Sequence, residues 1–189
     1  MSEFSQSYHL KSSDSAAAVQ LLEQAGKGGI VFPARSGWVT FVVEDAEFIA
    51  DEAIVSLNPG LLVYYFYAED HGWGAQVFNQ AELVFDYECE WEEDMIVHKK
   101  LYDLKVIQQL AEEQGRDAGE LKRILDEENE HEEPFAFEEP PAYLFAETVG
   151  LPHYQWLAAS YYTPEDPVFE GAVIVKGPEP LDGTEDEQS

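Results

Sequence analysis

Three strand-like runs follow one another between Leu61 and Trp91 with only short turns between them, and this feature constrains the fold most. The first run, LLVYYFYA (61–68), is apolar on both sides of a pleat, which predicts a central strand covered on both faces. The second run is GAQVFN (74–79). The third, LVFDYECEW (83–91), alternates between apolar and acidic residues, so one of its faces meets the core. Together the runs predict an antiparallel meander.

Two further β-rich runs precede the meander. GIVFPA (29–34) and WVTFVVE (38–44) are separated by a short polar turn and are predicted to pair as a hairpin. The hairpin and the meander predict an α+β fold with an antiparallel sheet of about five strands. Such a sheet needs an apolar cover, and we expect helices on one of its faces.

Helical patterns supply the expected cover. Asp14 and Asp103 stand at N-cap positions, and Gly26 and Gly115 stand where the same two helices end. The helices are expected at residues 15–25, 46–57, 104–114, 117–125 and 143–162, the last one broken at residues 150–152.

The chain is expected to form one α+β domain, residues 15–171, between a flexible N-terminus and a disordered acidic tail. A polar run rich in glutamate and proline, DEENEHEEPFAFEEPP, is expected to be an exposed loop within it. The expected divisions are 1–14 for the N-terminus, 15–91 for the sheet-rich part, 101–162 for the helical part, 126–141 for the acidic loop and 172–189 for the tail.

The charge balance restricts the partners of the chain. It has 39 acidic and 10 basic residues, for a formal net charge of −29 at pH 7. A surface of this sign repels phosphate backbones and anionic lipid headgroups. We therefore expect neither nucleic acid nor a membrane among the partners. The same charge would also serve solubility or a salt-rich habitat, and the sequence leaves that interpretation open.

Cysteine content and hydropathy indicate the compartment. Cys89 is the single cysteine, so an internal disulfide is impossible, as expected in a reducing compartment. Residues 1–15 lack the basic and then apolar pattern of a secretory signal. The longest apolar run, 61–68, is far shorter than the roughly 18 residues of a membrane span. The sequence predicts a cytoplasmic protein.

The turn EDHGW, residues 69–73, contains candidate chemistry. Glu69, Asp70 and His71 are residue types that serve general acid–base catalysis or bind a hard metal ion. Consecutive residues of a strand point to opposite faces, so the three converge only if the turn bends them together. Turn chemistry alone explains Asp70 and Gly72, and no spacing typical of a metal or cofactor site appears. No cofactor or metal is therefore expected.

Clustered carboxylates are the second candidate. Asp86, Glu88 and Glu90 point to one face of the third strand-like run, and like charges in such a row destabilise a sheet. Phe135 and Phe137 lie among the carboxylates of the acidic loop, where apolar anchors inside an acidic rim suit a basic partner surface. The interpretation we favour is a protein-binding module, inhibitor-like or immunity-like, that engages a basic protein.

Two alternatives remain at this stage. The first is a small metal-assisted enzyme built on Glu69, Asp70 and His71. The second is a binder of a small ligand or peptide that uses Trp38 and Trp73, each of which follows a glycine at an expected hairpin tip. The sequence leaves the oligomeric state open.

Overall fold

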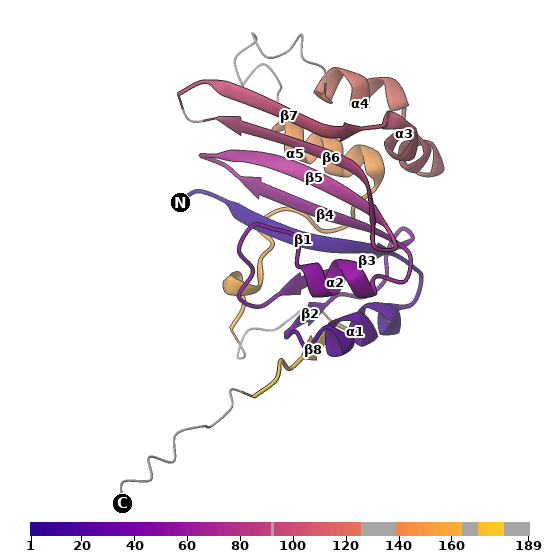
Figure 1. Cartoon of the computed structure of the whole chain (residues 1–189), viewed down its shortest axis with the longest axis vertical. Coiled ribbons are helices and arrows are strands. Elements are labelled where there is room, and N and C mark those ends of the chain that lie inside the picture. The colour runs from indigo at the N-terminus through magenta and orange to yellow at the C-terminus, as the bar shows by residue number, and fades with distance from the viewer. Residues whose placement is uncertain (92, 126–138, 164–169, 180–189) are drawn as a thin grey trace, which may run out of the picture.

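The computed structural model describes residues 1–91, 93–125, 139–163 and 170–179, and within them eight strands form one sheet (Figure 1). The order across the sheet is β7-β6-β5-β4-β1-β3-β2-β8, and every neighbouring pair is antiparallel. The strands are β1 (Phe4–Lys11), β2 (Gly29–Val31), β3 (Trp38–Val43), β4 (Leu61–Ala68), β5 (Gly72–Asn79), β6 (Glu82–Trp91), β7 (Met95–Tyr102) and β8 (Val173–Val175).

The mixed character of the fold and its antiparallel sheet are confirmed, but the expected number of about five strands is wrong. The hairpin β2–β3 and the meander β4–β5–β6 form as predicted. The additional strands are β1, β7 and β8. β7 follows β6 directly and forms one edge of the sheet, and β8 forms the other edge within the range expected to be a disordered tail, 172–189.

β1 corrects the expectation of a flexible N-terminus over residues 1–14. It lies between β3 and β4 in the middle of the sheet, with Tyr8 opposite both Phe41 and Tyr64. Its sequence, FSQSYHLK, is rich in polar residues and so does not suggest a central strand. Its serines and histidine can nevertheless be buried, because they are hydrogen-bonded. The hydroxyl of Ser7 lies 2.9 Å from Nε2 of His9, whose Nδ1 lies 3.0 Å from Oγ1 of Thr40.

One face of the sheet carries the larger part of the core. Trp73 of β5 packs there with ring centroids 5.0 Å from Tyr87 of β6 and 5.4 Å from Phe145 of α5. The helices that contribute buried residues to this cluster are α3 (Leu104–Glu113), α4 (Ala118–Leu125) and α5 (Pro141–Val149).

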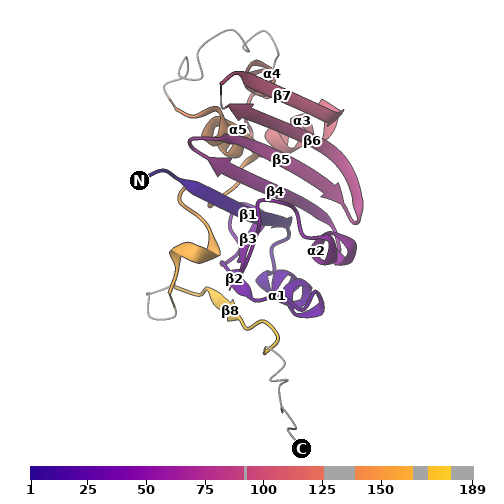
Figure 2. The same ribbon diagram turned by 60° about the vertical axis from the view of Figure 1, so that its left-hand side comes forward.

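The opposite face carries a second core, so the expectation of helices on one face only is wrong. α1 (Ser15–Gln24) and α2 (Glu52–Leu57) pack here against β1, β3 and β4, with Tyr8, Phe41 and Tyr64 buried among them. Figures 1 and 2 show α2 on one side of the sheet and α5 on the other. The LLVYYFYA run is covered on both faces because two separate sets of helices serve its two sides.

α1 and α2 cover only the half of their face near β1, β3 and β2 (Figure 2). No described helix covers the remaining part, formed by the end of β4 at Phe66 and by β5, β6 and β7, on the side away from α3, α4 and α5. We call this part of the sheet the open face; Phe66, Gly74, Glu88 and His98 lie on it, opposite one another in register. Among the described helices, none has the length and apolarity needed to cross a membrane.

Candidate functional site

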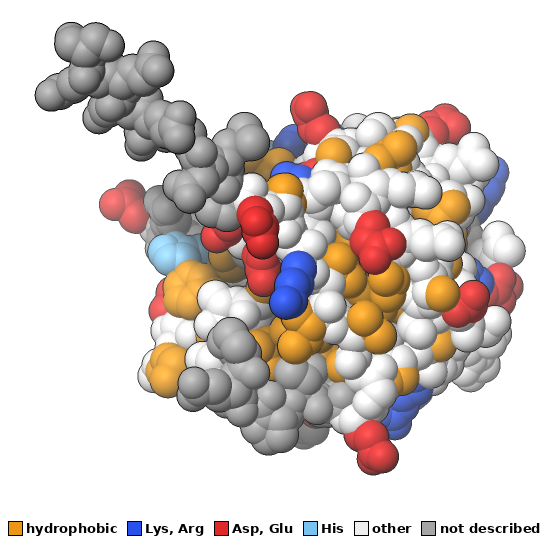
Figure 3. Space-filling model, turned by 90° about the horizontal axis from the view of Figure 1, so that it is seen from below, with side chains coloured by type: hydrophobic (Ala, Val, Ile, Leu, Met, Phe, Trp, Pro, Cys, Tyr) orange, Lys and Arg blue, Asp and Glu red, His pale blue; other side chains and the backbone are white. Residues whose placement is uncertain are grey.

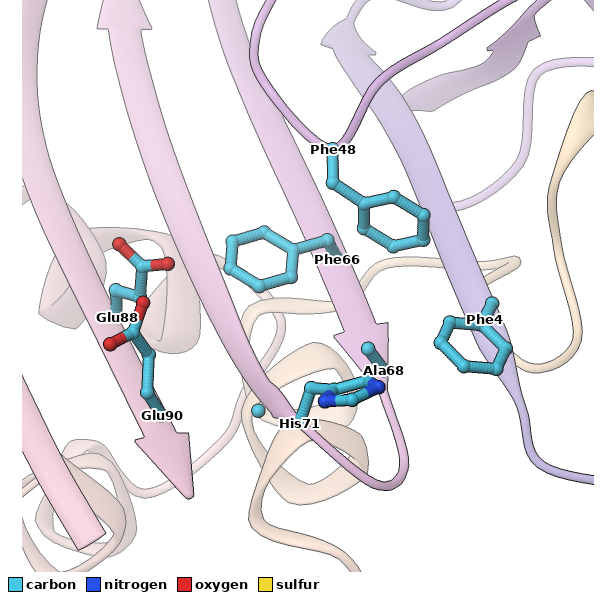
Figure 4. Close-up of a pocket in the computed structure, with 8 residues that line it drawn as sticks. Phe4, Phe48, Phe66, Ala68, His71, Glu88 and Glu90 are labelled. Atoms are coloured by element: carbon cyan, nitrogen blue, oxygen red, sulfur yellow. The ribbon is translucent and has the colours of Figure 1, made fainter. Parts of the chain in front are cut away.

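A pocket of about 240 Å³ lies on the open face, at the end where β4 turns into β5. Figure 4 shows Glu88 and Glu90 on one side of Phe66, with Phe48 and Phe4 on the other. The lining residues come from β1, β4, β5, β6 and two loops: Phe4, Phe48, Phe66, Ala68, His71, Gly72, Glu88 and Glu90.

The apolar walls are aromatic rings set nearly at right angles. Phe48 lies edge-to-face against both of its neighbours, 6.3 Å from Phe4 at 82° and 6.3 Å from Phe66 at 88°. The imidazole of His71 lies 5.9 Å from the ring of Phe4. Edge-to-face pairs of this kind are favourable contacts.

Two glycines of β5 present bare backbone to the open face: Gly72 lines the pocket, and Gly74 lies beneath the ring of Phe66. A Cβ atom at Gly74 would lie 2.5 Å from Cε1 of Phe66, and one at Gly72 would lie 2.3 Å from the carbonyl oxygen of Cys89. Gly72 also has a φ of 151°, which other residues rarely adopt. Since Gly74 pairs with Glu88 across the sheet, the ring of Phe66 leans over bare backbone towards that carboxylate.

Phe48 reaches the pocket from the loop between β3 and α2, and the side-chain amide of Gln6 bonds to that loop twice. The N–H of Phe48 donates to Oε1 of Gln6 over 3.1 Å, and Nε2 of Gln6 donates to the carbonyl of Ala46 over 3.2 Å. The hydroxyl of Tyr64 donates to the same Oε1 over 3.2 Å. Phe48 has a φ of 57°, an outlier for a bulky residue that costs about 1–3 kcal/mol and that clusters at functional sites.

The carboxylate of Glu88 stands in an environment that disfavours its charge. Burial raises the pKa of Glu88, and the negative charges of Glu90 and Asp86 act in the same direction, against Lys100 and His98 of β7. Nε2 of His98 lies 3.4 Å from Oε2 of Glu90. These cations stand on β7, on the side of β6 away from β5, whereas the pocket, which Phe66 and His71 also line, lies on the β5 side.

The structure confirms that Asp86, Glu88 and Glu90 share one face of β6, but only two of them are accessible. Asp86 is 6% exposed and accepts a hydrogen bond of 3.2 Å from Nε2 of Gln76, its partner in register. Asp86 is therefore buried and is not part of the accessible acidic surface. Glu88 and Glu90 remain as the acidic rim.

The residues of the EDHGW turn do not converge. Oε2 of Glu69 accepts a hydrogen bond of 2.9 Å from the N–H of Glu3, and Asp70 accepts one from the hydroxyl of Ser2. Both carboxylates thus fasten the start of β1, and His71 alone lines the pocket. Within the described residues, no three His, Cys, Asp or Glu side chains are grouped as metal ligands would be.

Trp38 and Trp73 require a correction, because neither stands at an exposed hairpin tip. Each is 1% exposed and packs in the core on the side of α3, α4 and α5. Phe135 and Phe137 lie outside the described residues. The aromatic residues that do line the pocket, Phe4, Phe48 and Phe66, were not singled out from the sequence.

Comparison of the chain with protein-family models, with curated proteins and with solved structures found no match. Its function is therefore inferred from the geometry of the site. That geometry combines a preformed aromatic pocket, the bare backbone of Gly72 and an acidic rim formed by Glu88 and Glu90.

Proposed function

We propose that the protein is a binding module for a basic protein, inhibitor-like or immunity-like, and that the open face is its contact surface. The observation that carries the proposal is the position of Glu88 and Glu90 at the rim of a preformed pocket on a sheet face that no described helix covers. The comparison with inhibitors and immunity proteins is one of charge and surface chemistry.

The raised pKa of Glu88 supports this proposal. A carboxylate whose pKa is raised by burial and by like charges weakens the folded state at neutral pH. A cation that arrives from a partner offsets the neighbouring like charges, and its attraction to the carboxylate is stronger at a partly buried site than in water. The arrangement therefore favours binding over stability.

The overall charge adds a long-range component. A net charge of −29 attracts a basic protein from a distance and accelerates association, and salt screens this attraction. Figure 3, which views the end of the molecule that carries β8 and α1, shows acidic side chains scattered among basic and apolar ones. Acidic residues on other faces thus contribute to attraction, while we assign recognition to the open face.

Affinity capture with two variants of equal charge tests the proposal. One variant is Glu88→Gln/Glu90→Gln, and its control is Glu23→Gln/Glu112→Gln, which removes the same two charges from exposed positions on α1 and α3. From a native cell extract at low salt, we expect the wild type and the control to retain the same basic protein, and high salt to release it. The open-face variant should retain at least about tenfold less.

Two outcomes would overturn the proposal. If the wild type retains no basic protein at low salt, the protein is not a binding module of this kind. If both variants lose the partner to the same extent, net charge alone explains retention, and the open face is not the contact surface.

A further inference from the structure

The geometry points to an arginine side chain of the basic partner as the occupant of the pocket formed by Phe4, Phe48, Phe66, His71, Glu88 and Glu90. This inference rests on the proposed function and names the group that is recognised. The pocket offers such a guest aromatic rings and a rim of two carboxylates.

The lining selects a cation. The face of an aromatic ring carries partial negative charge, so the rings of Phe48 and Phe66 attract a positive group. Glu88 and Glu90 add two formal negative charges on the same side of β6. An anion would be repelled by both, and a neutral apolar guest would leave the carboxylates desolvated without a partner.

The spacing of the carboxylates favours a guanidinium group over an ammonium group. Glu88 and Glu90 are two residues apart on one strand, which places their Cβ atoms about 7 Å apart. A guanidinium group presents N–H donors on several edges, so it can bond two carboxylates while its plane stacks on a ring. It is also less strongly hydrated than an ammonium group and enters a half-apolar pocket more easily.

The pocket is already organised for its guest. The hydrogen bond from Phe48 to Gln6 fixes one wall, and the ring of Phe66 lies against the backbone at Gly74. Little side-chain entropy is then lost on binding. Lys100 and His98 approach the carboxylates from β7, and the described pocket lining contains His71 but no Lys or Arg, which leaves this side to a cation from outside the chain.

Three small probes that share a butyl chain test the inference with the full-length protein. They are butylguanidinium, butylammonium and the neutral butylurea, titrated while the NMR signals of the pocket rings are followed. We expect butylguanidinium to shift the signals of Phe48, Phe66 and His71, and to bind roughly tenfold more tightly than butylurea. Its affinity should also exceed that of butylammonium.

The same variants serve as controls here. Glu88→Gln/Glu90→Gln should weaken butylguanidinium binding about tenfold, and Glu23→Gln/Glu112→Gln should leave it unchanged. A third variant, Phe48→Ala, removes one aromatic wall of the pocket and should weaken butylguanidinium binding without removing a charge. Thermal unfolding of each variant establishes that it is folded.

The outcomes separate the inference from the proposed function. Equal affinity for butylurea and butylguanidinium, or tighter binding of butylammonium, overturns the arginine assignment, even if capture of a basic protein still depends on Glu88 and Glu90. Conversely, butylguanidinium binding that depends on these residues, together with failed capture of any basic protein, overturns the proposed function and retains a guanidinium pocket.

Discussion

Oε1 of Gln6 accepts a hydrogen bond of 3.1 Å from the N–H of Phe48, and this contact joins the central strand to the loop that forms one wall of the pocket. Gln6 is buried, and Phe48 has the left-handed backbone conformation that its bulk disfavours. The wall is therefore held in place by a residue that does not itself line the pocket.

Replacing Gln6 tests this dependence. We predict that Gln6→Ala lowers the free energy of unfolding by about 1–3 kcal/mol, because the N–H of Phe48 and the hydroxyl of Tyr64 lose their shared acceptor. Urea unfolding measures this change, and amide exchange at Phe48 should accelerate. The control Gln109→Ala, at an exposed position on α3, should change stability by less than about 0.5 kcal/mol. Equal effects of the two substitutions would contradict the role of Gln6.

Two adjacent tyrosines of β4 offer a matched pair. The hydroxyl of Tyr64 donates to Gln6, whereas that of Tyr65 is buried on the other face without a hydrogen-bond partner among the described residues. We predict that Tyr64→Phe costs about 1 kcal/mol of unfolding free energy, and that Tyr65→Phe is neutral or stabilising by up to about 1 kcal/mol. Chemical denaturation of both variants measures the difference. A larger loss for Tyr65→Phe than for Tyr64→Phe would show that the hydroxyl of Tyr65 is bonded in solution.

Acid should destabilise the fold through His9. Burial lowers the pKa of His9 to about 3, and the nearby charge of His153 acts in the same direction. Below the ordinary histidine pKa of about 6.5 the unfolded chain binds a proton that the folded chain does not. Stability should therefore be complete above pH 6.5 and fall by up to about 1.4 kcal/mol per pH unit as the pH decreases towards 3.

Urea unfolding between pH 7 and pH 5 measures this slope before most carboxylates titrate. His9→Gln should flatten the slope, because glutamine takes up no proton in either state. The pKa of His153 is also lowered, by burial and by Arg35, so some slope should remain in the variant. An unchanged slope in His9→Gln would contradict the assignment.

Glu88→Gln should raise stability at neutral pH while it weakens binding. The folded-state pKa of Glu88 is raised, so its charge destabilises the folded state above the ordinary glutamate pKa, and this effect vanishes once acid protonates both states. We predict a higher midpoint of thermal unfolding for Glu88→Gln at pH 7 and no gain near pH 3. A lower midpoint at pH 7 would mean that the carboxylate supports the fold, and the argument that it is kept for binding would fail.

Local patterns in the sequence predict the parts of this fold that depend on neighbours along the chain. Asp14 and Asp103 accept hydrogen bonds from the second residue of α1 and of α3, as caps do. The alternation of LVFDYECEW predicts which side of β6 carries Glu88 and Glu90, because the period of a strand is two.

Features that depend on tertiary contacts are invisible to such patterns. β1 has a polar sequence, yet it lies in the core, because the side chains of Ser7 and His9 hydrogen-bond to each other there. The helix expected at 143–162 ends at Val149, where Gly150 adopts a φ of 81°, and the chain continues to a 3-10 turn at Ala159–Tyr161.

The candidate site likewise has one part that the sequence predicts and one part that it does not. Its acidic rim is contained in one strand and is readable from the sequence. Its aromatic walls come from Phe4, Phe48 and Phe66, which are far apart in the sequence and meet only when β1 inserts beside β4 and the loop before α2 folds over both. Trp38 and Trp73, the aromatic residues that the sequence indicated for binding, are buried in the core.

The most direct test of the central claim, that Glu88 and Glu90 form specific contacts with a basic partner, is the dissociation rate of the captured complex. Long-range charge acts mainly on association, whereas contacts at a desolvated site act on dissociation. We predict that Glu88→Gln/Glu90→Gln raises the dissociation rate constant about tenfold or more, and that Glu23→Gln/Glu112→Gln leaves it unchanged and only slows association slightly. If both variants merely slow association by the same factor, the carboxylates of the open face act as general surface charge and the claim is wrong.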